Sequence, residues 1–352
     1  MKTLASLLKN VSVKQLLGAA DTAVSGITYD SREVVAGSMF FAVKGTRVDG
    51  HNYIDQVIEK GASVIVCETL PEKINGQVAY VVVADSSFAL GAIASNWFNN
   101  PSEKLQLVGI TGTNGKTTTV TLLFNLFRQL GYHTGLLSTI LNRIDDEIIP
   151  STHTTPDAIQ LNALLDRMVQ KGCSYCFMEV SSHAIVQNRV AGLRFAGGIF
   201  SNITHDHLDF HKTFDEYLKA KKRFFDELPT GAFALTNLDD RNGMVMLQNT
   251  RASKHTYSFQ KVADFKGRII EAPLDGLHLE LDGNEIWCRL VGRFNGYNLM
   301  TVYAASVLLK QNPIEVLTIL SNLQSVEGRF DYIKSPQGII GIVDYAHTPD
   351  AL

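Results

Sequence analysis

The stretch LQLVGITGTNGKTTT, residues 105–119, constrains the fold of this chain more than any other segment. An apolar run typical of a buried strand leads into a glycine-bearing turn. From Lys116 onward, apolar residues recur at the three- and four-residue spacing of a helix. Such an arrangement aims unpaired backbone N–H groups and the positive end of the helix dipole at one point. The stretch therefore predicts a phosphate-binding loop within an α/β domain.

The loop residues indicate how a nucleotide would be held. Lys116 would reach the β- and γ-phosphates, and the Thr117 hydroxyl would ligate the Mg²⁺ that accompanies them. Ile110 stands where the general nucleotide-loop pattern has its first glycine, so the match is to the shorter form GxxGKT. We expect ATP or a close relative as the ligand, and we expect these contacts: Gly112, Thr113, Asn114, Gly115, Lys116, Thr117 and Thr118.

Composition limits the partners of the chain. The sequence has 352 residues and a formal net charge of -3 at pH 7, so it presents no field for nucleic acid. Lys9 and Lys14 interrupt the N-terminal apolar positions, and no apolar run reaches membrane-spanning length. We therefore expect a cytoplasmic protein, a monomer by default, whose partners are small molecules and include neither nucleic acid nor a membrane.

Cys173 and Cys176 form a CxxC motif between a predicted helix and a predicted buried strand. No second pair is present to complete a metal site, so we interpret both as packing residues in preference to a redox pair.

Strand and helix signals alternate along the chain and predict two α/β domains. Residues 1–101 form a small N-terminal domain with strands at 38–43, 62–67 and 79–84 and helices at 51–60 and 86–98. Residues 102–333 form a central domain with a mostly parallel sheet, helices on both faces and ligands at the carboxyl ends of the strands. Its further elements are strands at 133–140, 175–180, 195–203 and 232–236, helices at 156–170 and 214–228, antiparallel hairpins within 255–292 with a turn at 282–284, and helices from 296 and 314.

The segment GIIGIVDYAHTPDAL, which starts at residue 338, predicts one more buried strand followed by a polar loop. A buried strand needs partner elements, and none follow it. We therefore expect residues 334–352 to be the first part of a third domain that is largely absent from this sequence.

Two polar clusters follow apolar strands of the central domain. Glu179 ends one strand and could reach a metal beside the phosphate loop, while the serines after it suggest a helix cap. The stretch SNITHDHLDFH contains His205, Asp206, His207, Asp209 and His211. Binuclear zinc hydrolases use a similar HxHxDH pattern, but here Phe210 shifts the spacing by one residue. One His or Asp that assists Mg²⁺ is the better interpretation.

The helix predicted at 214–228 has a lysine on its apolar stripe. Phe214, Leu218, Phe225 and Leu228 mark the stripe, and Lys221 occupies the position where a leucine is expected. A buried lysine needs a partner or loses its proton, and a neutral amine can react with CO₂. The alternative is a lysine whose ammonium group snorkels to solvent.

Five ordered motifs resemble those of the Mur ligases of peptidoglycan synthesis: GITGTNGKTTT, MEVSSHAIVQNRV, DHLDFH, GRFNGYN, and VEGRFDYI with VDYAHTPDAL. The resemblance covers essentially the whole chain. It implies a UDP-sugar domain, an ATP domain and a Rossmann-like third domain for the incoming amino acid. It also implies that ATP activates a substrate carboxylate as an acyl phosphate, which the amino group then attacks. DSR and HTTPDA favour UDP-N-acetylmuramoyl-L-alanyl-D-glutamate as substrate and a diamino acid, meso-diaminopimelate or L-lysine, as the addition. Diaminopimelate is preferred because it is the more frequent.

The resemblance also implies residue roles. Thr117 and Glu179 would hold one Mg²⁺, while His207 and a carbamylated Lys221 would hold a second. Lys116, Glu179, His207 and Lys221 form the implied catalytic set. The further implied ATP contacts are Asn295, Asn298, Arg329 and Asp344. The implied contacts to the UDP-sugar peptide are Ser31, Thr154, Thr155, Ser181, Gln187 and Arg189.

Other functions stay open at this point. Another Mur ligase or a folylpolyglutamate synthase would share the ATP domain and the carbamylated lysine. Without a third domain, the chain could also act as a nucleotide-sugar-binding module that does not turn over. ATP-dependent turnover, as opposed to binding alone, separates these alternatives.

Overall fold

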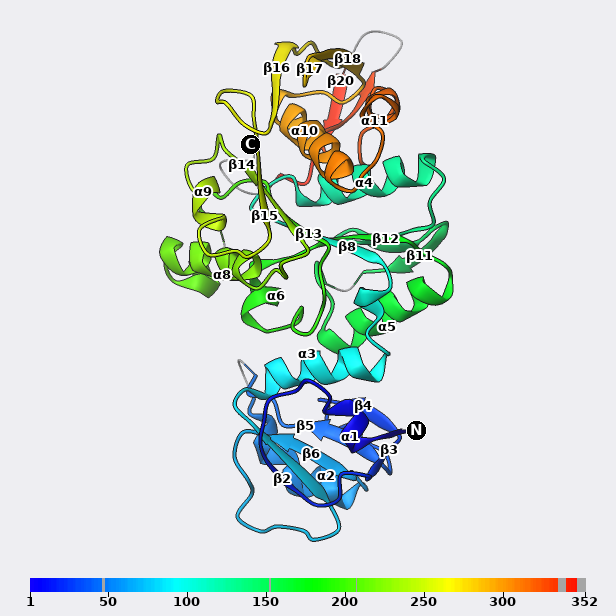
Figure 1. Ribbon diagram of the computed structural model, residues 1–352, viewed down its shortest axis with the longest axis vertical. Coiled ribbons are helices and arrows are strands. Elements are labelled where there is room, and N and C mark those ends of the chain that lie inside the picture. The colour runs from blue at the N-terminus through cyan, green and yellow to red at the C-terminus, as the bar shows by residue number, and fades with distance from the viewer. Residues whose placement is uncertain (46–47, 152, 207, 335–339, 347–352) are drawn as a thin grey trace. The chain divides into compact units, whose positions relative to one another are not determined.

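The computed structural model describes residues 1–45, 48–151, 153–206, 208–334 and 340–346 (Figure 1). The chain divides into two compact units. The first unit comprises Met1–Lys104, Pro156–Arg167 and Val186–Leu193, and the second comprises Leu105–Thr155, Met168–Ile185 and Arg194–Leu352. Within the described ranges, no helix combines the length and the apolar character that crossing a membrane requires.

The first unit is built on a five-stranded sheet with the strand order β2-β7-β6-β5-β4. Four strands are parallel, and β2 is antiparallel to β7. The strands are β2 (Val13–Leu17), β4 (Gly26–Thr28), β5 (Ser38–Phe41), β6 (Val64–Cys67) and β7 (Ala79–Val83). A separate antiparallel pair is formed by β1 (Lys2–Thr3) and β3 (Ala23–Val24). The helices are α1 (Leu4–Leu7), η1 (Gly50–Tyr53), α2 (Ile54–Glu59), α3 (Ser86–Trp97) and η2 (Pro101–Glu103).

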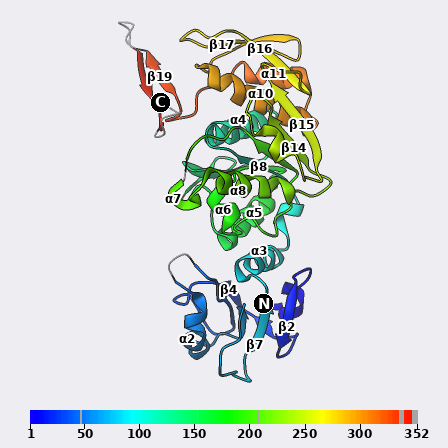
Figure 2. The ribbon, with the colours of Figure 1, turned by 90° about the vertical axis from the view of Figure 1, so that its left-hand side faces the viewer.

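Alternation along each strand divides the apolar side chains of this unit between two cores. Met39 and Phe41 of β5 pack in the core that includes α1 and α3, whereas Phe40 packs in the core that includes α2. The predicted strands at 38–43, 62–67 and 79–84 and the predicted helices at 51–60 and 86–98 are therefore confirmed as elements, with shorter bounds (Figure 2).

Two segments that the sequence assigned to the central domain pack in the first unit instead: 156–167 and 186–193. Ala158, the first residue of α5 (Ala158–Gln170), joins the core of α1 and α3. The Asn188 side-chain amide donates hydrogen bonds to Asp85 Oδ2 over 3.0 Å and to Ser87 Oγ over 2.7 Å. These contacts join residues about a hundred positions apart, so sequence order alone did not reveal them.

The second unit contains an eleven-stranded sheet with the order β11-β10-β9-β12-β8-β13-β14-β15-β16-β17-β18. The strands from β9 to β16 in this order are parallel, and both ends of the sheet are antiparallel hairpins. The parallel strands are β8 (Gln106–Thr111), β9 (Thr134–Leu137), β12 (Tyr175–Glu179), β13 (Gly197–Phe200), β14 (Phe233–Asn237), β15 (Ser253–Ser258) and β16 (Phe265–Glu271). The hairpin strands are β10 (Leu141–Ile144), β11 (Glu147–Pro150), β17 (Leu277–Leu281) and β18 (Asn284–Cys288).

Helices cover both faces of this sheet, as the alternating pattern predicted. One face is covered by α4 (Lys116–Gln129), and α10 (Arg293–Leu308) and α11 (Pro313–Leu320) pack against α4 (Figure 1). On the other face lies α8 (Phe214–Asp226), whose Phe224 ring takes up the space beside Gly109 and Gly198. Three short helices complete the unit: α6 (Ser182–Val186), α7 (Leu208–His211) and α9 (Gly243–Met246).

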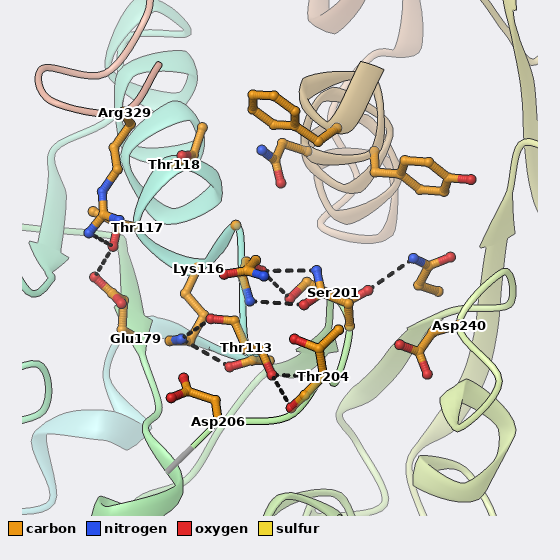
Figure 3. A pocket seen from close by; sticks show the side chains of 18 of the residues that line it. Thr113, Lys116, Thr117, Thr118, Glu179, Ser201, Thr204, Asp206, Asp240 and Arg329 are labelled. Atoms are coloured by element: carbon orange, nitrogen blue, oxygen red, sulfur yellow. Dashed lines mark hydrogen bonds between the residues drawn. The ribbon is translucent and has the colours of Figure 1, made fainter. Parts of the chain in front are cut away.

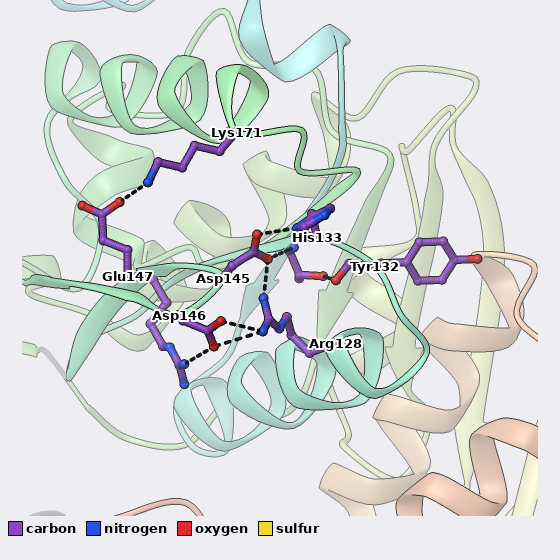
Figure 4. A network of polar contacts seen from close by, with 9 residues as sticks. Arg128, Tyr132, His133, Asp145, Asp146, Glu147 and Lys171 are labelled. Atoms are coloured by element: carbon purple, nitrogen blue, oxygen red, sulfur yellow. Dashed lines mark hydrogen bonds and ion pairs between the residues drawn. The ribbon is translucent and has the colours of Figure 1, made fainter.

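A polar network fixes the hairpin of β10 and β11, which the sequence did not predict (Figure 4). Asp145 in its turn has φ +52° and accepts hydrogen bonds from the Thr134 N–H and from Arg128 at the end of α4. Asp146 pairs with the same guanidinium over 3.0 Å, and His133 Nδ1 lies 2.6 Å from Asp145 Oδ2. The turn is therefore held to α4 and β9 by charge and hydrogen bonding, which no local pattern signals.

Two predictions for the C-terminal part are wrong. Residues 255–292 are not all antiparallel, because β15 runs parallel to both β14 and β16; only β16, β17 and β18 form hairpins, with the predicted turn at 282–284. The strand predicted to be buried is β20 (Ile340–Val343), which pairs with β19 (Asp331–Lys334) and leaves Ile342 49% and Val343 54% exposed (Figure 2). An apolar run does not by itself say whether anything covers it.

Candidate active site

The strand order of the large sheet changes direction at β8, which lies between β12 and β13. The carboxyl ends of parallel strands leave a crevice at such a point. A cavity of about 840 Å³ opens there, lined by the residues that follow β8, β12, β13 and β14 (Figure 3). The position of the cavity is the one that the sequence predicted for ligands of this domain.

The predicted phosphate loop forms one wall of this cavity, and α4 begins at Lys116. Gly115 has φ +84°, and a Cβ atom there would lie 2.5 Å from Asn298 Oδ1, so only glycine fits. The Lys116 ammonium donates hydrogen bonds to the carbonyls of Gly112 and Thr113, over 2.9 and 2.8 Å. The loop thus wraps around its own lysine and presents its backbone N–H groups at a helix N-terminus.

The segment after β13 is hydrogen-bonded to this loop. Asn202 Oδ1 accepts from the Asn114 N–H over 2.9 Å, and Ser201 Oγ donates to the Asn114 carbonyl over 2.7 Å. The Thr204 N–H donates to Thr113 Oγ1 over 3.0 Å. Sequence reasoning missed Ser201, Asn202 and Thr204, although their place at the carboxyl end of an apolar strand was a usable signal.

Glu179 lies beside the phosphate loop, where β12 ends, and is 1% exposed. Its Oε1 accepts from the Thr117 hydroxyl over 2.9 Å and from the Thr139 N–H over 2.7 Å. Arg329 Nη2 in turn donates to Thr117 Oγ1 over 3.1 Å, and its guanidinium lies 4.9 Å from the ring of Tyr345. The structure therefore brings together three predicted residues that lie far apart in the sequence.

Lys221 is 1% exposed, so the alternative of a snorkelling lysine is wrong. Its Nζ donates to the Gly112 carbonyl over 2.8 Å and lies 4.5 Å from the ring centre of Tyr217. Burial holds the pKa of this amine well below 10.5, and the charge of Lys116 lowers the pKa further, while Asp206 opposes the shift. Burial also lowers the pKa of Lys116, against the influence of Glu179 and Asp206. These surroundings therefore shift Lys221 toward its neutral amine, relative to a lysine in water.

Not every predicted ATP contact reaches the cavity. Asn298, Arg329 and Asp344 line it, but Asn295 does not. Asn295 is buried behind Asn298, accepts from its amide over 2.9 Å and donates to the Val291 carbonyl over 2.8 Å. Asn295 therefore orients Asn298. The rest of the cavity wall includes groups that the sequence analysis did not name: Asp239, Asp240, Tyr257, Gln260, Phe294 and Tyr297.

The residues predicted to contact the UDP-sugar peptide divide between the two units. Thr154 and Ser181 line the cavity of the second unit, whereas Thr155 is buried behind it and donates to the Glu179 carbonyl over 2.9 Å. Ser31, Gln187 and Arg189 belong to the first unit. There Arg189 Nε donates to Gln187 Oε1 over 2.9 Å, and Lys60 donates to the Ser31 carbonyl over 2.7 Å. His207 lies outside the described residues.

A phosphate loop beside a buried carboxylate and a buried neutral amine suits transfer of a phosphoryl group from a nucleotide to a second substrate. The fold and the site thus define a nucleotide-binding enzyme, and the comparisons with known proteins identify its class as ATP-dependent ligase. The chain belongs to the Mur ligase family: the Mur ligase middle domain matches residues 110–306, and the Mur ligase family catalytic domain matches residues 23–98.

Individual relatives extend this comparison. The chain is 56% identical over 349 residues to the UDP-N-acetylmuramoyl-L-alanyl-D-glutamate–2,6-diaminopimelate ligase of Parabacteroides distasonis, which takes in 99% of this chain and 72% of that protein. It is 58% identical over 347 residues to the ligase of the same name from Cytophaga hutchinsonii, with 98% and 71% covered. A solved structure of a ligase of that name superposes with a TM-score of 0.84 at 24% identity, over 100% of this chain and 72% of that one. That the last residues of this sequence begin a further domain stays a prediction.

Proposed function

We propose that this chain joins 2,6-diaminopimelate to UDP-N-acetylmuramoyl-L-alanyl-D-glutamate with ATP as the energy source. The observation that carries the proposal is the 56% identity over 349 residues with a relative of that name. The identity extends over both units, so it includes the residues predicted to bind the UDP-sugar as well as those predicted to bind ATP. In this proposal residues 1–101 serve the UDP-sugar, together with the segments 156–167 and 186–193 that pack in the same unit, and the rest of residues 102–333 serves mainly ATP.

The proposed reaction has two steps. A carboxylate oxygen of the UDP-sugar peptide attacks the γ-phosphorus of ATP, the bond from that phosphorus to the bridging oxygen breaks, and ADP leaves. The amino group of the diamino acid then attacks the acyl carbon. The carbon–oxygen bond to phosphate breaks, the nitrogen loses a proton, and the amide and inorganic phosphate are formed.

The residues of the chain contribute to these two reaction steps mainly by positioning the reacting groups. The backbone N–H groups of the phosphate loop and the N-terminus of α4 would hold the phosphates, with Lys116 as a fixed cation among them. Asn202 and Thr204 brace the loop from the neighbouring segment, so little reorganisation is needed when charge moves toward the second substrate.

The residues present fit Mg²⁺. Hard divalent cations prefer oxygen ligands, and the Thr117 hydroxyl and the Glu179 carboxylate meet at the wall of one cavity, 2.9 Å apart. Thr117 and Glu179 would hold one ion, and His207 and a carbamate on Lys221 would hold a second. When bound, the ions would offset the negative charge that gathers between the γ-phosphate and the attacking carboxylate.

The surroundings of Lys221 support the carbamate. A buried amine that is held neutral has a free electron pair for CO₂, and carbamate formation releases one proton and leaves an anion with two oxygen ligands. The negative charge that the carbamate brings beside the phosphate loop would give a metal ligand where the sequence has only a lysine.

The proposal is tested by calorimetric titration of this chain with UDP-N-acetylmuramoyl-L-alanyl-D-glutamate, with UDP and with dihydrofolate. Turnover of ATP would then be measured with diaminopimelate or L-lysine added. We expect tight binding of the muramoyl peptide, weaker binding of UDP and none of dihydrofolate. Failure of the folded protein to bind the muramoyl peptide would overturn the proposal. Binding without ATP-dependent amide formation would instead indicate a nucleotide-sugar-binding module.

A further inference from the structure

Helix α7 begins at Leu208, two positions after Asp206, which lines the cavity. The helix has only four residues, and so short a helix is not stable by itself, so tertiary contacts must hold it. Those contacts converge on its last residue, His211, which is 5% exposed. His211 Nε2 lies 2.8 Å from Ser182 Oγ, and the His211 ring lies 5.1 Å from the ring of Tyr217.

Ser182 belongs to a different part of the site. It is the first residue of α6, follows the strand that ends in Glu179, lines the cavity and is 1% exposed. Its surroundings are fixed, because the Ser181 N–H donates to Thr155 Oγ1 and the Ala184 N–H donates to Ser181 Oγ, each over 3.2 Å. The hydrogen bond between Ser182 and His211 therefore ties α7 to a rigid support beside Glu179.

Aromatic packing holds α7 from the same side. The ring of His183 lies 4.0 Å from the ring of Phe210 and 5.7 Å from the ring of His211. Ring contacts of this kind keep α7 against α6 but allow a range of distances between them. A hydrogen bond between two buried groups sets one distance. The polar contact thus sets the distance between α7 and Ser182.

The other end of the same segment is also anchored. The Thr204 N–H donates to Thr113 Oγ1 of the phosphate loop over 3.0 Å. Asp206 lies between the two anchors in the sequence and lines the same cavity as Lys116 and Lys221. Figure 3 shows the Asp206 side chain on the same side of the cavity as Glu179 and Lys116.

We propose that His211 is a positioning residue that, through its hydrogen bond to Ser182, fixes α7 and so helps to set the place of the Asp206 carboxylate, two positions before α7, in the phosphate and metal region of the cavity. The inference rests on the proposed function, in which that region binds a divalent cation with the nucleotide. Loss of the hydrogen bond should therefore weaken cation binding even where the fold is kept.

The test measures binding of Mn²⁺, as a stand-in for Mg²⁺, to the chain with ADP present, by electron paramagnetic resonance. We expect His211→Leu and Ser182→Ala each to raise the Kd of Mn²⁺ by roughly 10- to 100-fold, the range for lost supports of metal sites. His211→Gln can place an amide near the Nε2 position and should restore most of the affinity. The double variant should bind no more weakly than either single one, because both remove one interaction.

Ser306→Ala is the matched control, because Ser306 is buried and its hydroxyl donates to the Val302 carbonyl inside α10, away from the cavity. It should lower the melting temperature without changing the Kd of Mn²⁺. If His211→Leu and Ser182→Ala behave like this control, or if their effects on the Kd add, the proposal is overturned. Ser182→Ala keeps the test valid should His211→Leu fail to fold. This measurement uses neither the muramoyl peptide nor an amino acid, so it is independent of the substrate assignment.

Discussion

The Thr117 hydroxyl donates a 2.9 Å hydrogen bond to Glu179 Oε1, although the two residues lie 62 positions apart in the sequence. The same Thr117 oxygen accepts from Arg329, and the same Glu179 oxygen accepts from the Thr139 N–H. One short chain of polar groups thus links the start of α4, the end of β12 and the segment after α11. Each partner limits where the others can point, so removal of one should disturb the others.

Thr117→Val keeps the shape of the side chain and removes its hydroxyl. We expect kcat/KM to fall by roughly 10- to 100-fold, the range for groups that orient a metal site, and the Mg²⁺ concentration for half-maximal activity to rise. Thr117→Ser retains the hydroxyl and should stay within a few-fold of the parent. Steady-state kinetics at varied Mg²⁺ measures both. Equal losses in the two variants would show that the methyl group, and not the hydroxyl, matters here.

Lys221→Met should abolish activity yet stabilise the fold at neutral pH in CO₂-free buffer. The pKa of Lys221 is lowered on folding, so between the folded value and 10.5 the unfolded chain holds a proton that the folded chain has released. The free energy of unfolding of the parent therefore rises with pH across this window. The variant lacks this contribution, so its advantage over the parent should shrink as the pH rises across this window toward 10.5. Denaturant unfolding at several pH values measures the difference.

Lys222→Met is the control for that experiment. Lys222 is the next residue of α8, but its ammonium pairs with Asp226 over 2.6 Å and does not line the cavity. Activity should persist in this variant, and its stability should follow the pH profile of the parent. A pH profile of Lys221→Met that matches the parent would show that Lys221 keeps its proton when the chain folds.

Tyr217→Phe removes one hydroxyl and keeps the ring beside Lys221. The Tyr217 hydroxyl lies 3.1 Å from Thr113 Oγ1 in the phosphate loop, and the side chain is fully buried. We expect the free energy of unfolding to fall by about 1 kcal/mol, the usual net value of one hydrogen bond, and the KM for ATP to rise several-fold. Tyr80→Phe removes a comparable buried hydroxyl that accepts from the Asn75 N–H in the first unit. It should cost similar stability and leave the KM for ATP unchanged; a shared change in KM would contradict the assignment.

Local patterns in the sequence predicted the parts of the site that a single segment contains. The phosphate loop is a strand, turn and helix in direct succession, Glu179 ends an apolar run, and Lys221 interrupts an apolar stripe. Each signal comes from backbone periodicity and burial, which operate within about a dozen residues. For the same reason the longer helices and strands were predicted, whereas short ones, such as the β10–β11 hairpin, were missed.

The missing parts depend on which segments meet. Asn202 braces the phosphate loop 88 positions away, and Asn295 orients Asn298 where a direct ligand contact was predicted. The prediction of a buried strand after residue 338 failed for the same reason. Ile342 belongs to this apolar run, but nothing covers it among the described residues. The hydrogen-bond partner of a side chain and its burial depend on which segments meet in the fold. Local patterns in a single sequence do not reveal them.

The final prediction concerns Asn188, which stands between Gln187 and Arg189 in the first unit. It has φ +55°, a conformation that asparagine tolerates and that most side chains resist, and its amide donates to Asp85 and Ser87 at the start of α3. Asn188→Ala should therefore cost about 1 to 3 kcal/mol of stability, from the lost hydrogen bonds and the strained backbone. Because the neighbours on both sides are predicted substrate contacts, the KM for the UDP-sugar peptide should rise while kcat changes little.

Two further variants separate the causes. Asn188→Gly removes the side chain but accepts the positive φ, so it should recover the part of the stability that Asn188→Ala loses to strain. Asn96→Ala removes another asparagine amide that makes two hydrogen bonds, to the carbonyls of Leu7 and Lys9, in the same unit. If Asn96→Ala lowers the melting temperature as much and also raises the KM for the UDP-sugar peptide, the effect of Asn188 is general instability. If only the Asn188 variants raise the KM, the segment from 186 to 193 positions the substrate contacts, because its anchor to α3 is then the feature that binding depends on.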